Sequence, residues 1–136
     1  MVCVHCGKAT KVVNSRLQRR SNQVWRRRRC IGCRAVFTTE ESVDYETAWT
    51  VKNKAGSYRP FSADKLLLSL YRSLEHRQAA LGEATELKQT IIKRLRAEVD
   101  SGTTTNGQIR EAAQVALTRF DKAAATHYEA HHRQSA

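Results

Sequence analysis

Four cysteines stand out as candidate metal ligands in this sequence of 136 residues. They form two C-x-x-C pairs, Cys3 with Cys6 and Cys30 with Cys33. Each C-x-x-C turn presents two thiolates on one side of an ion, so the two turns together can supply a tetrahedral zinc site. Four protein ligands leave no position for water, which predicts one structural zinc ion and not a catalytic one. The alternatives left open are an iron–sulfur cluster and disulfides.

The histidines are weaker candidates for metal binding. His5 lies inside the first cysteine pair and could replace a cysteine, but with four thiols present it is expected to be a spectator. His127, His131 and His132 have the spacing of ligands on one helix. Nothing else in the sequence supports a second site there, so an exposed polar helix end is the preferred interpretation.

A run of arginines leads directly into the second cysteine pair. If this run is a strand, Arg26 and Arg28 share one face and Arg27 and Arg29 the other, because successive side chains of a strand point to opposite sides. Guanidinium groups at such density favour phosphate contacts, although a solvated basic face is the alternative. The candidate nucleic-acid contacts are six arginines of the N-terminal segment: Arg16, Arg26, Arg27, Arg28, Arg29 and Arg34.

The positive charge is concentrated in the same part of the chain. The formal net charge is +11, and residues 1–41 hold ten Lys and Arg against only Glu40 and Glu41. The remaining residues hold fourteen basic against eleven acidic side chains. This asymmetry predicts a polyanionic partner for the N-terminal segment. Trp25 beside the arginine run could stack on a base, but we expect it to cover a small core.

The pattern of apolar residues predicts two domains of an α+β chain. Residues 11–15 and 23–25 read as strands around a turn at 20–22, and residues 38–42 as a polar connector. Strands at 48–52 and 58–61 flank a turn at Gly56, and Ser62 is an expected N-cap for a helix over 63–77. Apolar stripes over 87–99 and 109–120 predict two more helices, and 122–133 a fourth. The predicted domains are a zinc ribbon of antiparallel strands (1–42) and a helical bundle with a β-hairpin cap (48–133).

Several classes of protein are not expected. The chain opens with no signal-peptide pattern and has no apolar run of about 20 residues, which predicts a cytoplasmic protein that does not enter a membrane. It has no paired carboxylates, no nucleophile with a base and no glycine-rich phosphate loop of the Walker type. We therefore expect no enzymatic activity.

These motifs together resemble the NrdR family of bacterial ribonucleotide reductase repressors. The matching elements are the two cysteine pairs, Ser15-Arg16, the arginine run and Phe37-Thr38-Thr39. The similarity continues into a segment that looks like an ATP-cone, a nucleotide-binding module with a small β-cap on a helical bundle. Its matching pieces are Val51-Lys52, Pro60-Phe61, Asp64-Lys65-Leu66, Leu74-Glu75-His76-Arg77 and Phe120-Asp121-Lys122.

The resemblance implies a DNA-binding repressor that senses ATP and dATP. It implies a homo-oligomer that binds repeated double-stranded operators upstream of ribonucleotide reductase genes, in the nucleoid of a bacterial cytoplasm. The residues implied in nucleotide binding are Val51, Lys52, Arg59, Phe61, Lys65 and Asn106.

Three positions depart from the family pattern. Val36 replaces the arginine of the family's R-F-T-T motif, and Arg59 replaces the glutamate before Pro-Phe. The family's A-Y-x-R-F pattern near the C-terminus reads Ala-Ala-Thr-His-Tyr over 124–128. These departures leave an alternative function open, a zinc-ribbon adaptor for nucleic acid or protein whose cone no longer senses a nucleotide.

Overall fold

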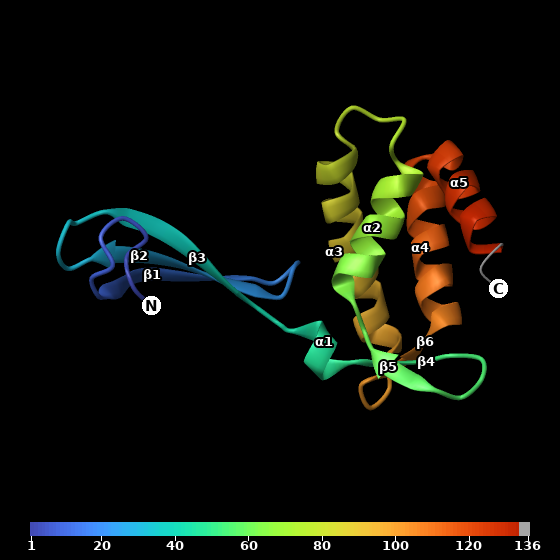
Figure 1. Ribbon diagram of the computed structural model, residues 1–136, viewed down its shortest axis with the longest axis horizontal. Helices are drawn as coiled ribbons and strands as arrows, with labels where there is room; N and C mark the ends of the chain where they lie inside the picture. Colours follow the sequence, from blue (N-terminus) through green and yellow to red (C-terminus); the bar gives the residue numbers. More distant parts are fainter. Residues whose placement is uncertain (134–136) are drawn as a thin grey trace. The chain divides into compact units, whose positions relative to one another are not determined.

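The computed structural model describes residues 1–133, and the chain separates into two compact units. The first unit comprises Met1–Val43 and the second begins at Asp44 (Figure 1). The fold is α+β, as predicted: antiparallel strands that carry the four cysteines come first, and helices with a small sheet follow. No helix among the described residues is long and apolar enough to cross a membrane.

The first unit is one three-stranded antiparallel sheet. Its strands β1 (Thr10–Gln18), β2 (Gln23–Cys30) and β3 (Val36–Ser42) lie in the order β1-β2-β3. The arginine run extends β2 beyond the predicted strand, because partners on both sides satisfy its backbone groups. The prediction of a connector at 38–42 was wrong, since these residues form most of β3. Aromatic and β-branched residues such as Phe37, Thr38 and Thr39 favour such a strand.

The β1–β2 hairpin contains a bulge and a tight turn. The pairing shifts between Val12 and Asn14, so that Val13 is the extra residue and Asn14 lies opposite Arg27. Asn22 ends the turn with a φ of 55°, a left-handed conformation that asparagine tolerates well. The turn and the bulge together set which residues of β1 and β2 face each other.

This unit has almost no apolar core. Its only buried residues are Cys3 and Cys30. Trp25, which we expected to cover a small core, is instead 42% exposed. A single sheet with no second layer offers no apolar surface to bury a tryptophan, which explains why that expectation was wrong.

The second unit begins with a short helix and a small sheet. Helix α1 (Tyr45–Ala48) precedes strands β4 (Thr50–Lys52) and β5 (Tyr58–Pro60), which form the predicted hairpin. Gly56 turns this hairpin with a φ of 85°, which glycine adopts at little cost. Strand β6 (Thr103–Thr105) pairs parallel to β4 and completes the order β5-β4-β6. Sequence reasoning missed β6, because its threonines also read as helix caps.

Four helices form the bundle of the second unit. They are α2 (Ala63–Ser73), α3 (Ala80–Glu98), α4 (Asn106–Phe120) and α5 (Lys122–Arg133). Ser62 caps α2 as predicted, and its hydroxyl accepts the N–H of Lys65 at 3.2 Å. Thr105 caps α4 in a reciprocal box with Gln108. Helix α2 ends at Ser73, before the predicted residue 77, and α3 starts at Ala80, before the first residue of its predicted stripe.

The helices enclose one apolar core. Helix α2 packs against α3 and α5, and α4 packs against the same two helices, while the small sheet lies at one end of the bundle (Figure 1). Its largest fully buried aliphatic side chains are Leu70, Leu74, Ile91, Leu95 and Leu117. At the sheet end Trp49 and Phe61 meet edge to face, with ring centroids 5.4 Å apart. This core fixes the positions of the helices relative to one another.

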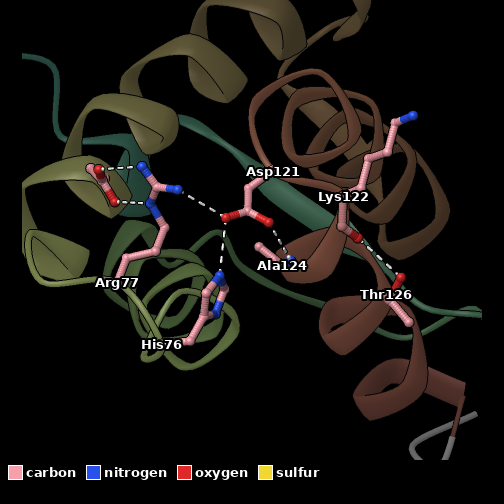
Figure 2. Close-up of polar contacts among 7 residues, drawn as sticks. His76, Arg77, Asp121, Lys122, Ala124 and Thr126 are labelled. Atoms are coloured by element: carbon pink, nitrogen blue, oxygen red, sulfur yellow. Dashed lines mark hydrogen bonds and ion pairs between the residues drawn. The ribbon is translucent and has the colours of Figure 1, made fainter.

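A cluster of four polar side chains, the Asp121 cluster, consists of His76, Arg77, Glu83 and Asp121 (Figure 2). The α2–α3 connection and the α4–α5 junction lie at the end of the bundle opposite the small sheet (Figure 1). Arg77 donates to both oxygens of Glu83, at 2.6 and 2.9 Å, and to Oδ2 of Asp121 at 3.0 Å. His76 Nε2 lies 3.0 Å from the same Asp121 oxygen.

Asp121 also caps the start of α5, because its Oδ1 accepts the N–H of Ala124 at 3.1 Å (Figure 2). This hydrogen bond, with those from His76 and Arg77, holds the pKa of Asp121 well below its usual range. The cluster thereby fixes the position of α5, which contributes two side chains to the cavity.

Candidate metal centre, basic ribbon and cavity

The four cysteines converge as a metal centre requires. Their Sγ atoms all lie within 4.8 Å of one another, and those of Cys3 and Cys33 are 3.7 Å apart. The Sγ atoms of Cys6 and Cys30 are 3.5 Å apart. Tetrahedral zinc with Zn–S bonds of about 2.3 Å places its sulfurs about 3.8 Å apart, whereas a disulfide requires about 2.05 Å. The separations therefore fit one zinc ion, and none of the four cysteines forms a disulfide.

Backbone hydrogen bonds shape each cysteine turn. The N–H of His5 donates to Cys3 Sγ at 3.4 Å, and the N–H of Gly32 donates to Cys30 Sγ at 3.3 Å. Burial opposes ionisation of Cys30, but the backbone N–H groups of Cys33 and Gly32 lower the pKa of its thiol to about 6. The N–H of Ala35 opposes the shift of Cys33, but the thiol of Cys6 and burial raise the pKa of Cys33 to about 11. The thiolate is the form that binds metal, so Cys30 is the thiol of this turn that ionises more readily.

The histidines lie outside the cysteine centre. Within residues 1–133, the cysteines are the only cluster of three or more Cys, His, Asp or Glu side chains close enough to hold a metal ion. His132 Nδ1 lies 2.8 Å from the carbonyl oxygen of Tyr128, and its Nε2 lies 3.2 Å from Ser69 Oγ. Since a carbonyl only accepts, Nδ1 carries the proton and a neutral Nε2 accepts from the serine hydroxyl.

The arginine run alternates between the two faces of β2, as predicted. Arg27 and Arg29 are exposed, whereas Arg26 and Arg28 are half-buried on the opposite face. Arg26 Nη2 pairs with Glu41 Oε2 at 3.0 Å. Arg28 Nε donates to Thr39 Oγ1 at 3.2 Å.

The other two candidate DNA contacts occupy different places in the ribbon. Arg16 lies opposite Trp25 and therefore on the face of Arg27 and Arg29. Arg34 is exposed in the second cysteine turn, with a φ of 63°.

The second unit contains a cavity of about 430 Å³ between β4, β5, α2, α4 and α5. It is lined by five of the six residues predicted to bind a nucleotide: Val51, Arg59, Phe61, Lys65 and Asn106. The sixth, Lys52, is not part of the lining, and its Nζ lies 5.8 Å from the centroid of the Tyr58 ring. The structure therefore gathers residues that lie far apart in the sequence, with one exception.

The cavity wall is cationic. Arg59, Lys65 and Arg110 line it, and no aspartate or glutamate of the described residues does. Arg59 Nη2 donates to Asn106 Oδ1 at 2.9 Å. Sequence reasoning missed Arg110, although its place one helical turn after Asn106 puts the two residues on the same face of α4.

Two further lining residues come from α5. Tyr128 and His132 stack with ring centroids 4.0 Å apart, and both line the cavity. Burial lowers the pKa of His132, which favours its neutral form against the cationic wall. No short motif points to these two residues, because they reach the cavity only through the docking of α5 on the bundle.

The sheet with its cysteine centre and the helical unit together define a zinc-ribbon protein with a second, α-helical domain. Residues 1–41 match the family described as "Transcriptional repressor NrdR-like, N-terminal domain". The chain is also 33% identical to the transcriptional repressor NrdR of Heliobacterium modesticaldum, over 88% of this chain and 84% of that protein. The chain therefore belongs to the NrdR family of transcriptional repressors.

Proposed function

We propose that this protein represses ribonucleotide reductase genes by binding operator DNA, and that ATP or dATP in its second unit controls this binding. Family membership supports repression. The ribbon supports DNA binding, because its arginines lie on a small scaffold whose shape depends on a metal. The resemblance of the second unit to an ATP-cone supports the choice of adenine nucleotide.

The observation that carries this proposal is the cationic cavity. A volume of about 430 Å³ lies within the range of about 300–1,000 Å³ typical of small-molecule sites. Arg59, Lys65 and Arg110 supply three positive charges that suit a polyphosphate. With no carboxylate among the lining residues of the described range, 1–133, the cavity disfavours a cationic ligand.

Control of DNA binding would operate by linkage. A nucleotide shifts a population of oligomers only if it binds one arrangement more tightly than another. Joining two or more ribbons at the spacing of operator repeats multiplies weak individual contacts. In this scheme the zinc ion holds the ribbon together, the protein works in the bacterial cytoplasm, and no bond of the nucleotide is broken.

Calorimetric titration of the zinc-loaded protein with ATP and with dATP tests the nucleotide site. We expect saturable binding of at least one of them, and weaker binding after Lys65→Ala. GTP serves as the control for base recognition. If neither adenine nucleotide binds, the second unit is not a nucleotide sensor. The protein is then better described as a zinc-ribbon adaptor whose ATP-cone no longer binds a nucleotide.

A further inference from the structure

The two faces of the ribbon sheet differ in how their charges are engaged. Residues directly opposite each other on paired strands point to the same face, so the register assigns each paired side chain to one face of the sheet. We call one face the Trp25 face: it carries Trp25, Arg27, Arg29, Lys11 and Arg16. The reverse, the Cys30 face, carries Arg26 and Arg28 beside Cys30.

The arginines of the Cys30 face are occupied within the sheet. Arg26 forms its ion pair with Glu41, and Arg28 donates to Thr39 and, at 3.5 Å, to Thr10 Oγ1. These contacts join β2 to both neighbouring strands. Releasing either guanidinium to a ligand would therefore break these contacts between strands.

The cations of the Trp25 face are free. Lys11, Arg16, Arg27 and Arg29 form no ion pair or side-chain hydrogen bond with any residue of the described chain, 1–133. The one carboxylate on this face is Glu40, opposite Trp25. Four unpaired cations against one carboxylate make this face the more positive one.

The geometry of the Trp25 face suits a regularly charged polymer. Alternate residues of a strand lie about 7 Å apart and neighbouring strands about 5 Å apart, so the four cations form a patch. Duplex DNA carries one charge per about 1.7 Å of its axis, which places several phosphates within reach of such a patch. Trp25, exposed on the same face, adds flat apolar surface that stays in water unless a ligand covers it.

We infer that double-stranded DNA binds to the Trp25 face, and that Arg26 and Arg28 hold the sheet together and do not contact DNA. This inference rests on the proposed DNA binding and specifies which face of the sheet the DNA contacts. It divides the arginine run, whose four members have the same chemistry, by what each side chain touches.

Two double variants of equal charge test this assignment. Arg27→Gln/Arg29→Gln and Arg26→Gln/Arg28→Gln are compared in the zinc-loaded full chain, with duplex DNA titrated at several salt concentrations. The first variant is expected to lower the slope of log K against log salt by about 2 per bound ribbon and to weaken binding about 60-fold at 0.1 M salt. The second is expected to keep the wild-type slope and to lose thermal stability. Equal losses of slope, or loss only in the second variant, would overturn the assignment.

A second measurement needs no change in the arginines. The chain has two tryptophans, and Trp49 is buried whereas Trp25 is exposed. Acrylamide should quench Trp25 in the free protein, and saturating duplex should abolish that quenching. Trp25→Phe identifies the signal. Unchanged quenching of Trp25 with DNA bound would overturn the inference while leaving the proposed function intact.

Failure of the proposed function has a different signature. If the wild-type protein binds no duplex at any salt concentration, or prefers single-stranded RNA, then both the proposed function and the assigned face are wrong. If the protein binds duplex DNA but Arg26→Gln/Arg28→Gln is the variant that loses slope, only the assignment of DNA to the Trp25 face is wrong.

Discussion

The two units of this chain are stabilised in opposite ways. In the ribbon, the buried residues are Cys3 and Cys30, two of the four thiols that converge on one point. In the second unit, buried leucines, isoleucines and alanines of four helices form a continuous core with Trp49 and Phe61. The ribbon thus depends on a metal centre for the cohesion that the second unit obtains from apolar burial.

The contrast explains where binding surfaces are found. A unit of about 40 residues buries too little apolar surface to fold unaided, so a metal must contribute to its stability. Most side chains of this unit consequently lie on the surface, where arginines and a tryptophan can contact a large ligand such as a DNA duplex. The helical unit has the depth to form a cavity, which suits a small molecule.

Removal of zinc should give the largest effect and separate the two units. Structural zinc sites contribute about 10–16 kcal/mol in apparent binding free energy, so a chelator or Cys30→Ser should unfold the ribbon. Amide NMR signals of residues 1–43 should lose their dispersion, and those of the helical unit should persist. If both units unfold, or neither does, the two units are not stabilised independently by metal and by apolar burial.

A core truncation should have the converse effect. Leu70 is 0% exposed, and Leu70→Ala should destabilise the helical unit by about 2–5 kcal/mol, because it leaves a cavity in the core. Leu68→Ala, in the same helix and 54% exposed, is the matched control and should cost less than about 0.5 kcal/mol. Chemical denaturation gives both values, and zinc stoichiometry should not change in either variant.

The Asp121 cluster should make the stability of the helical unit depend on pH in the acid range. The pKa of Asp121 is lowered in the folded state, so its contribution is present above the unfolded value of about 4 and is lost as pH falls below it. Asp121→Asn keeps a side-chain acceptor for the Ala124 N–H but removes the charge. The variant should lower the melting temperature at pH 7 and flatten the decline between pH 4 and pH 2. An unchanged acid profile would show that the cluster contributes nothing.

The smallest effect expected concerns two lysines of the helical unit. Lys65 lines the cavity and Lys52 does not. Loss of one charged hydrogen bond to a phosphate costs about 1.4 kcal/mol, so Lys65→Ala should weaken nucleotide binding about tenfold. Lys52→Ala should weaken it less. The reverse order in titration calorimetry would mean that the nucleotide lies elsewhere.

Features set by neighbouring residues could be predicted from the sequence. The two cysteine pairs predicted the clustering of the four thiols, and the period of a strand predicted the alternation of Arg26 to Arg29. The Ser62 cap and the hairpin turn at Gly56 are likewise local, and both are confirmed.

Features set by tertiary context could not be predicted from the sequence. The exposure of Trp25 depends on whether a second layer covers the sheet, and no motif encodes that absence. Strand β6 exists because β4, about fifty residues earlier, lies beside it. Tyr128 and His132 join the cavity only because the Asp121 cluster and the core hold α5 in place.

The most direct test of the whole account is the binding of the zinc-loaded protein to a promoter fragment of its own genome's ribonucleotide reductase operon. Binding is measured with ATP, with dATP and with neither, at near-physiological salt. We expect sequence-specific binding whose affinity changes with the nucleotide. Binding that ignores both the sequence and the nucleotide would contradict this expectation.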